Sequence, residues 1–487
     1  MRKRVKKVML VTPPYHSGVV ESAGVWLPLG LVYIAGSLRQ AGYDVEIYDA
    51  MSLFHTHEDI IRKIITDRPD VVATTAITAS LPDAVEVLSH AKMIDEHIIT
   101  VIGNVHPTFM FNELLNDHSS IDYVVRGEGE VTFVELLDAI NACGNMGHVK
   151  GIAFKENNVI RVTPNRELSM SLDALTPAWD LVNWEDYRYF PDDNATLGIV
   201  SSSRGCIHQC SFCSQQLFWE KRWRQRSALS FVNELEMLSE RYGVKVVMLA
   251  DEYPTANRQR WVDILNLIIQ KGLKIKLLLE TRVDDIVRDE DIMDLYVKAG
   301  VSHIYVGVES GSNTSLELFK KDIKAEQSKR AIDIINKAGI ISETSFVLGM
   351  PYETHDTISH ALDTAVYYNP DMAFFLAIAP WPYSDIYPQL KEHITVKDYR
   401  RYNLVEPVVK PDAMELSELE DALVQTTKEF YMHKMRQLKS LSMDKRRFMV
   451  RLMTILMKNS YIGAKLRGMM KDDEQIRYMM QKEALNP

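Results

Sequence analysis

Short apolar segments alternate with helical segments along two long stretches of this 487-residue chain. In the first stretch, residues 1–145, the expected strands are residues 8–11, 44–48, 71–76, 98–103 and 123–125. Strands that are apolar along their whole length are typical of a parallel sheet covered by helices on both faces. The pattern therefore predicts an α/β fold that begins with a flavodoxin-like, doubly wound domain, in which ligands bind beyond the carboxyl ends of the strands.

The loops that follow these strands carry small, polar and glycine residues at one edge of the predicted sheet. The candidate ligand-binding residues in them are Thr12, Tyr15, His16, Thr78, Gly103, His106, Gly127 and Glu128. Turn chemistry explains any single loop of this kind, but four loops at the same edge favour a ligand-binding face. No Gly-x-Gly-x-x-Gly opens the first helix, so a dinucleotide is not the favoured ligand.

A second series of strands begins near residue 196. The expected strands are residues 197–202, 244–250, 275–280, 303–308, 344–348 and 373–378. Six strand–helix units form a partial (β/α)6 barrel more readily than a closed eight-stranded barrel. We expect this partial barrel over residues 196–390, after a hairpin and linker over residues 146–195. A mostly helical region is expected over residues 391–487, ending in the basic, Met-rich stretch 445–471.

The composition narrows the class of protein. The chain has 56 Lys and Arg against 66 Asp and Glu, a net charge of −10. We expect no nucleic-acid partner, because phosphate binding depends on Lys and Arg. No apolar run approaches the ~20 residues of a membrane span, and the start of the chain lacks the apolar region of a signal peptide. Three of the four cysteines lie within eight residues, which favours a metal site in a reduced, cytoplasmic protein over a disulfide framework.

That cluster has the spacing Cys-x3-Cys-x2-Cys, formed by Cys206, Cys210 and Cys213. Three thiolates on one short loop can hold three irons of a [4Fe-4S] cube and leave the fourth iron open to a small molecule. The competing interpretation is a zinc site completed by His208. Cys-x-His-x-Cys crowds its ligands, whereas structural zinc sites usually use two separated pairs, so the iron–sulfur interpretation is favoured. We expect Cys143 to be a small packed hydrophobe rather than a fourth ligand.

At this motif the chain resembles the radical S-adenosylmethionine superfamily, in which the same cysteine spacing follows the first barrel strand. Phe212, before the last cysteine, is also typical of that superfamily. The resemblance implies that S-adenosylmethionine binds the open iron through its amine and carboxylate. One electron, from a low-potential donor such as ferredoxin or flavodoxin, then cleaves it to methionine and a 5′-deoxyadenosyl radical. That radical abstracts hydrogen from an unactivated carbon.

The resemblance also implies that polar residues at the ends of the later barrel strands bind this cofactor. Asp251 and Glu252 stand where the superfamily commonly has Gly-Gly-Glu, which binds the methionyl amine. The other candidates are Arg282 after the third strand, Glu309 and Ser310 at the usual ribose position, and Gly349 at the position near the adenine. Each is explained equally well as an ordinary loop residue, but four strand ends in register favour one shared site.

The first domain looks like the cobalamin-binding domain found in one branch of this superfamily. The Asp-x-His-x-x-Gly motif that supplies a cobalt ligand in many B12 domains is absent. Neither His16 nor His106 is therefore assigned as a cobalt ligand. Because the corrin in this branch is often held without a protein histidine, cobalamin remains an expected cofactor.

Narrower features resemble the anaerobic magnesium-protoporphyrin IX monomethyl ester cyclase family of bacteriochlorophyll synthesis. They include Cys213-Ser214-Gln215, Phe218-Trp219 and Lys410-Pro411-Asp412-Ala413-Met414, and the match runs from about residue 7 to about 435. The resemblance implies a magnesium porphyrin substrate whose ester-bearing propionate is oxidised, with the ketone oxygen taken from water, and closed into the fifth ring of protochlorophyllide. The residues that would stack on or pair with it are Phe218, Trp219, Trp223, Trp381, Arg222, Arg224 and Arg226. Core packing for the aromatic residues and a solvated cationic face for the arginines are the alternatives.

Other functions stay open at this point. A B12-dependent radical methyltransferase acting on another large substrate would share the cluster, the cofactors and the domain order. A cobalamin- or iron–sulfur-binding sensor would not need the carboxylates at the strand ends. In the C-terminal region, basic residues among apolar ones fit a peripheral membrane contact, but a helical cap over the barrel is favoured. Those basic residues are Arg446, Arg447, Arg451, Lys458 and Lys465.

Overall fold

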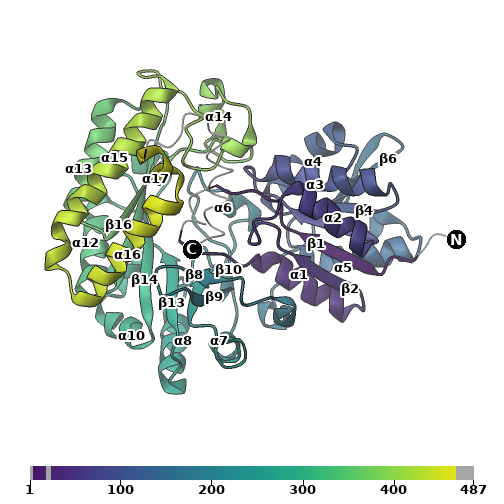
Figure 1. The fold of residues 1–487 in the computed structure, drawn as a ribbon, viewed down its shortest axis with the longest axis horizontal. Helices are drawn as coiled ribbons and strands as arrows, with labels where there is room; N and C mark the ends of the chain where they lie inside the picture. The colour runs from purple at the N-terminus through teal and green to yellow at the C-terminus, as the bar shows by residue number, and fades with distance from the viewer. Residues whose placement is uncertain (1–3, 18–22, 468–487) are drawn as a thin grey trace. The chain divides into compact units, whose positions relative to one another are not determined.

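The computed structural model describes residues 4–17 and 23–467. The remainder, including Gly18 of the first predicted ligand loop and the last four residues of the stretch 445–471, lies outside the described residues. The chain divides into two compact units (Figure 1). Unit 1 comprises residues 1–16 and 27–186, and unit 2 comprises residues 17–26 and 187–487. The segment 17–26 belongs to unit 2 because Gly24 forms a β-bridge with Tyr189, and the N–H of Val25 donates to the carbonyl of Arg188.

Unit 1 is built on a sheet of strand order β2-β1-β3-β4-β5-β6-β7. Its parallel strands are β1 (Lys7–Val11), β2 (Asp44–Tyr48), β3 (Val71–Thr75), β4 (Ile99–Gly103) and β5 (Tyr123–Val125). The order 2-1-3-4-5 is that of a flavodoxin-like doubly wound domain, which confirms the predicted fold. β6 (Ile152–Glu156) and β7 (Val159–Val162) form an antiparallel hairpin that continues the same sheet.

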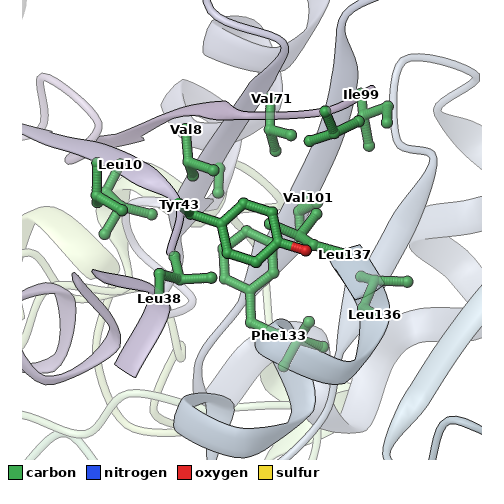
Figure 2. Close-up of a cluster of buried hydrophobic side chains, with 14 of the residues drawn as sticks. Val8, Leu10, Leu38, Tyr43, Val71, Ile99, Val101, Phe133, Leu136 and Leu137 are labelled. Carbon is green, nitrogen blue, oxygen red and sulfur yellow. The ribbon is translucent and has the colours of Figure 1, made fainter. Parts of the chain in front are cut away.

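Helices cover the sheet of unit 1 on both faces. α1 (Leu29–Gln40) packs beside α5 (Gly129–Asn141), whereas α2 (His57–Asp67) packs beside α3 (Leu81–Ile94), and α4 (Val105–Asp117) packs against β5. Figure 2 shows the core between α1, α5 and the strands, where Val8, Leu38 and Phe133 are almost fully buried. Burial of each such side chain contributes about 1.5–3 kcal/mol.

Cys143 departs from its predicted role. It was expected to be packed as a small hydrophobe, but it is exposed. The helix α5 ends at Asn141, and Cys143 follows in a left-handed turn at φ 50°, which carries its side chain away from the core. The expectation was wrong because it placed this residue at the end of the helix.

Unit 2 is built on an open sheet of order β16-β15-β14-β13-β12-β9-β8. All six predicted strands are present and parallel, as β9 (Ala195–Val200), β12 (Val246–Leu249), β13 (Lys276–Thr281), β14 (Val301–Glu309), β15 (Ile341–Leu348) and β16 (Met372–Ala377). β8 (Arg188–Tyr189) is antiparallel to β9. Among the described strands, β8 and β16 form the two edges and do not pair with each other, so the predicted partial barrel is confirmed.

Helices alternate with these strands, including α7 (Ala228–Tyr242), α8 (Arg258–Lys271), α12 (Ala325–Lys337) and α13 (His355–Tyr368). The C-terminal helices are α15 (Leu416–Gln437), α16 (Met443–Asn459) and α17 (Tyr461–Leu466). Phe448 of α16 packs with residues of β12, β13, β15 and β16, so this helix crosses the sheet and forms the predicted cap.

Several cationic groups of this cap bind to other groups of the protein. Lys445 pairs with Asp371 at 2.6 Å, Lys465 pairs with Glu420 at 3.0 Å, and Arg446 donates to backbone carbonyls. In the part of the chain that the structure describes, no helix has the length and apolar character needed to cross a membrane.

Two glycines of α1, Gly30 and Gly36, allow a test of how close packing affects the stability of unit 1. A Cβ at Gly36 would lie 1.7 Å from the carbonyl oxygen of Thr176, whereas nothing lies within 4 Å of a Cβ at Gly30 in the same helix. We expect Gly36→Ala to destabilise unit 1 by about 2 kcal/mol or more, because backbone must move. Gly30→Ala, the matched control, should change stability by about 1 kcal/mol at most and in the favourable direction. Calorimetric unfolding of both variants tests this, and equal melting temperatures would contradict it.

Candidate active site

The cysteine loop lies between two short paired strands. β10 (Ser203–Arg204) precedes it and β11 (Arg224–Gln225) follows it, and their antiparallel pairing closes the base of the loop. Gly205 has φ +91°, and a Cβ there would lie 2.0 Å from the carbonyl oxygen of Arg222, so only glycine fits. Sequence and backbone together thus hold Cys206, Cys210 and Cys213 on one tight loop, with all three thiols half-buried and free of disulfides.

The middle of the loop is fixed by Ser211. Its N–H donates to the carbonyl of Phe319 at 2.8 Å, its hydroxyl donates to the carbonyl of Leu318 at 3.1 Å, and its own carbonyl accepts from the N–H of Ile386 at 2.9 Å. The ring of Phe212 packs edge-on against Phe319. Ser211 and Phe212 therefore tie the loop to neighbouring segments of unit 2.

The raised pKa values of the three thiols indicate that their thiolate forms need a bound cation. Burial raises the pKa of all three, that of Cys213 to about 11, and the charges of neighbouring thiolates add to the rise for Cys206 and Cys213. For Cys210, the charges of Lys321 and Arg282 partly offset the effect of burial on the pKa. Three thiolates at neutral pH are stable here only with bound metal, which is what an iron–sulfur cluster supplies.

The zinc interpretation does not fit. Four tetrahedral ligands at zinc bond lengths lie about 3.3–3.8 Å apart. Among the described residues, one group of three potential ligands has its ligand atoms within 4.8 Å of one another, and that group is His57, Glu86 and His90 in unit 1. His208 instead pairs with Asp322 at 3.6 Å and packs its ring on Tyr253. In the described part of the chain, the three thiols and His208 do not form such a close group of ligands.

Asp251 and Glu252, which follow β12, hold the cysteine loop. Asp251 accepts hydrogen bonds from the N–H of Ser202 at 2.7 Å and from the hydroxyls of Ser202 and Ser203 at 2.5 and 2.6 Å. Glu252 accepts from the N–H of Gly205 at 2.9 Å and from the indole N–H of Trp219 at 2.7 Å. Burial raises the pKa of both carboxyl groups, and these donors oppose the rise.

The predicted residues from later strands lie around the same loop. Arg282 is buried and donates to Asp284 at 2.9 Å, and its charge lowers the pKa of Cys206 and Cys210. Glu309 pairs with Lys321 at 2.8 Å and accepts from Ser345 at 3.1 Å. The hydroxyl of Ser310 accepts from the N–H of Ser312 at 3.1 Å.

Gly349 lies apart from these contacts. It has φ +84°, and its N–H donates to Glu353 at 2.8 Å. A Cβ at this position would lie 3.1 Å from the side chain of Leu419 in α15. The structure therefore gives Gly349 a packing role beside the C-terminal helix, and its contact with an adenine stays a prediction.

A row of polar residues crosses the sheet and was not among the predicted site residues. Glu280 of β13 is in register with Tyr305 of β14, which is in register with Glu343 of β15. The hydroxyl of Tyr305 lies 2.5 Å from that of Ser345, and Glu343 pairs with His303. The available signal was the presence of charged residues inside strands that are otherwise apolar.

Among the groups of this row, Glu280 has a carboxyl group whose pKa is raised into the neutral range. Its side chain keeps contact with solvent while protein atoms crowd it from several sides. Burial by these protein atoms raises the pKa of Glu280 to about 7, and the charges of Glu343, Glu252 and Glu309 contribute to the rise. Glu280 therefore changes protonation near neutral pH, which is where proton-transfer groups of enzymes operate.

Most of the residues predicted to contact a porphyrin instead contact other residues of the protein. The indole N–H of Trp223 donates to the carbonyl of Tyr253 at 2.8 Å, and buried Arg226 pairs with Glu234. Arg224 is buried with its guanidinium over the ring of Trp219. Arg222 is exposed, and Phe218 is half-buried beside Trp219.

In unit 1, the predicted ligand residues lie at the carboxyl edge of the sheet, and two of them, Thr78 and His106, contact each other. Thr12 donates to Asp49 at 2.7 Å, and His16 stacks on Phe54. The ring of His106 lies 3.1 Å from the hydroxyl of Thr78, and burial lowers the pKa of His106 to about 4, so the ring is neutral.

The other predicted residues of this edge are also held in place. Tyr15 is buried, and Gly103 ends β4. The N–H of Gly127 donates to Thr108 at 3.0 Å, and Glu128 accepts from the N–H of Ser169 at 2.8 Å. Gly127 has φ +73° with nothing within 4 Å of a Cβ, which leaves room for a ligand above the edge. Open space at this edge suits a large ligand such as a macrocycle.

Comparisons with known proteins agree with this architecture. The B12 binding domain family matches residues 15–137, and the radical SAM superfamily matches residues 200–365. An anaerobic magnesium-protoporphyrin IX monomethyl ester cyclase of Rubrivivax gelatinosus is 37% identical over 88% of this chain and 78% of its own length. An uncharacterized methyltransferase of Pyrococcus horikoshii is 34% identical over 84% of this chain and 88% of its own length.

Solved structures support the same fold. The methyltransferase TsrM of Kitasatospora setae, with cobalamin and a [4Fe-4S] cluster bound, has a TM-score of 0.68 at 17% identity and covers 88% of this chain and 89% of its own. The cobalamin-dependent enzyme OxsB has a TM-score of 0.69 at 18% identity and covers 99% of this chain and 84% of its own.

The fold and the site define a cobalamin-dependent radical SAM enzyme, with cobalamin, S-adenosylmethionine and a [4Fe-4S] cluster as its cofactors. The chain belongs to the family that contains the anaerobic magnesium-protoporphyrin IX monomethyl ester cyclases.

The cysteine assignment gives a direct prediction. Cys206→Ala, Cys210→Ala and Cys213→Ala should each remove most of the bound iron and its visible absorbance, because a three-ligand cluster loses its anchorage with any one thiolate. Iron and sulfide are measured after anaerobic reconstitution. Cys143→Ala is the matched control, since this exposed cysteine lies in unit 1, and it should bind iron as the wild type does. Full iron content in any of the first three variants would contradict the assignment.

Proposed function

We propose that this protein catalyses the anaerobic oxidative cyclisation of magnesium-protoporphyrin IX monomethyl ester to protochlorophyllide. The observation that carries the proposal is the 37% identity, over 88% of the chain, to a protein named as this cyclase. The identity extends through both units of the chain. A likeness confined to the segments that match the two cofactor-binding families would leave the substrate undefined. A cytoplasmic location and a low-potential electron donor, such as ferredoxin or flavodoxin, belong to the same proposal.

In this proposal the cofactors are held by the residues described above. Cys206, Cys210 and Cys213 hold the cluster. Glu252, Arg282, Glu309, Ser310 and Gly349 are the proposed contacts for S-adenosylmethionine, and the carboxyl edge of unit 1 binds cobalamin. Asp251 positions the cysteine loop, since its hydrogen bonds are made to Ser202 and Ser203. When bound, the cluster and S-adenosylmethionine supply the one-electron chemistry that removes hydrogen from an unactivated methylene.

In this proposal, residues of the chain accept the protons that the reaction releases. Conversion of a methylene to a ketone with oxygen from water releases protons, and so does the closing of the ring. Glu280, with a pKa of about 7, is the proposed acceptor because its solvent-accessible carboxyl group is ionised at slightly alkaline pH and lies in the polar row with Tyr305 and Glu343.

An apolar pocket of about 350 Å³ supports a large, mostly apolar substrate. It lies between β16 and helices α15 to α17, and its lining includes Phe374, Leu376, Tyr431, Met432, Met453 and Met457. The charge of Glu343 contributes to the raised pKa of Tyr431, so the pocket adjoins the polar row. A porphyrin has an apolar periphery and polar propionate groups. The apolar pocket suits the periphery, and the polar row suits the propionates.

The substrate assignment is tested by product analysis. Reconstituted protein is incubated anaerobically with S-adenosylmethionine, reductant, cobalamin and magnesium-protoporphyrin IX monomethyl ester, and mass spectrometry is used to identify the products. We expect protochlorophyllide together with 5′-deoxyadenosine. Formation of 5′-deoxyadenosine with an unchanged porphyrin would refute the substrate and retain the radical chemistry.

A cobalamin-dependent radical methyltransferase is the second candidate function. The observation that favours it is the 34% identity to an uncharacterized methyltransferase, which covers 88% of that relative's length. The same incubation distinguishes the two functions, because a methyltransferase yields S-adenosylhomocysteine as well as 5′-deoxyadenosine.

The role of Glu280 is tested by its pH dependence. Because the pKa of Glu280 is raised to about 7, its proton-accepting form, and with it the turnover of the wild type, should increase between pH 6 and pH 8. Glu280→Gln should be slower by about 100-fold at pH 8 and should lose this increase, while it still forms 5′-deoxyadenosine.

Glu240→Gln serves as the control, since Glu240 is an exposed residue of α7. It should keep the rate and pH profile of the wild type. A wild-type profile in Glu280→Gln would show that another group accepts the proton.

A further inference from the structure

Two adjacent helices of unit 1 bring together a set of metal-binding side chains that neither the cluster nor cobalamin uses. His57 is the first residue of α2, and Asp83, Glu86 and His90 follow one another on α3 at spacings of three and four residues. Residues at these spacings share one face of a helix, and α2 packs beside α3. The four side chains therefore face the seam between the two helices.

Their distances match those between ligands of one metal ion. His57 Nε2 lies 3.3 Å from Asp83 Oδ1 and 3.4 Å from Glu86 Oε2, and His90 Nε2 lies 3.4 Å from Glu86 Oε1. Ligand atoms of His57, Glu86 and His90 all lie within 4.8 Å of one another. Zinc bonds of about 2.0–2.2 Å in a tetrahedron place neighbouring ligand atoms about 3.3–3.6 Å apart. Each of these imidazole nitrogens thus lies at the separation of neighbouring zinc ligands from a carboxylate oxygen, with Glu86 facing the two histidines through its two different oxygens.

The imidazoles also have unmet bonding requirements. Both ring nitrogens of His90 and Nδ1 of His57 are buried and make no hydrogen bond. Buried polar atoms in native proteins nearly always have a partner, and an unsatisfied one destabilises the fold. The contact of 3.4 Å between His90 Nε2 and Glu86 is too long for a good hydrogen bond. A cation bound between the two residues would satisfy this nitrogen.

We propose that His57, Glu86 and His90 bind one divalent transition-metal ion, with zinc as the best match and Asp83 as a fourth ligand or an orienting acceptor for His57. Two neutral imidazoles with one or two carboxylates are a common zinc ligand set. The two carboxylates carry a total charge of −2, which balances the ion. Glu86 is partly exposed, with 43% of its side chain accessible, so the ion can enter from solvent.

The site would clamp the elements that shape the ligand edge of unit 1. α2 follows the loop that contains Phe54, on which His16 stacks. α3 follows the loop that contains Thr78, which contacts His106. A metal ion that joins α2 to α3 therefore stabilises both loops together. Its function is structural, and it acts on the loops predicted to contact cobalamin.

The test uses the holoenzyme with its iron–sulfur cluster intact, so that the three loop cysteines are already occupied. After mild chelation, zinc is added in competition with a chromophoric chelator. We expect one equivalent of zinc to bind, and we expect zinc-edge X-ray absorption to show nitrogen and oxygen ligands without sulfur. Sulfur among the zinc ligands, or no retained zinc, would overturn the proposal.

Matched variants locate the ion. His90→Gln and Glu86→Gln should each weaken zinc binding by about 100-fold, since each removes a ligand. His97→Gln, an exposed histidine just beyond α3, should bind zinc as the wild type does. Zinc should raise the melting temperature of the wild type and of His97→Gln but not that of the other two. Because Glu86 is partly exposed, Glu86→Gln remains informative if His90→Gln fails to fold. Wild-type zinc affinity in Glu86→Gln would refute the site.

Discussion

The candidate active site depends on the hydrogen bonds that two adjacent carboxylates accept from the cysteine loop and its flanking residues. Asp251 binds the residues that lead into the loop, and Glu252 binds Gly205 and Trp219 on either side of the three cysteines. A buried carboxylate without donors is strongly unfavourable, so five hydrogen bonds from the loop and its flanks both stabilise the charges and fix the backbone. These bonds tie the loop that carries the three thiols to the segment that follows β12.

The charges around this loop divide the carboxyl end of the unit 2 sheet into two regions. Arg282 and Lys321 lie near Cys210, where their positive charges partly offset the rise that burial causes in the pKa of its thiol, and such charges favour the binding of an anionic group. Glu280, Tyr305 and Glu343 form a row on the sheet, where burial raises the pKa of Glu280 and the charge of Glu343 adds to the rise. A zwitterionic cofactor suits the first region, and a substrate that loses protons suits the second.

The order of both sheets was predictable because each strand is a short apolar run, and apolar runs alternating with helices leave few topologies. The position of the cysteines was predictable for the same reason, since the motif follows a strand. The role of Asp251 was not, because its partners lie 48 and 49 residues away and only the folded chain brings them near. Tyr305 and Glu343 were missed because strand register alone aligns them with Glu280, and Cys143 was misplaced because the end of α5 decides its exposure.

The two parallel sheets use the same edge in chemically different ways. In unit 1 the polar groups at the carboxyl edge are bonded to one another, as Thr12 is to Asp49 and Gly127 is to Thr108, and His106 is neutral. Such an edge offers shape, rings and room, with the carboxylates of Asp49 and Glu128 already bonded to donors of unit 1, which suits a large macrocycle. In unit 2 the same edge carries charged residues that contact the cysteine loop or change its thiol pKa values. A chain that binds both a macrocycle and a charged nucleoside needs both kinds of edge, and two mainly parallel sheets of different strand order, each with its own loops, provide them.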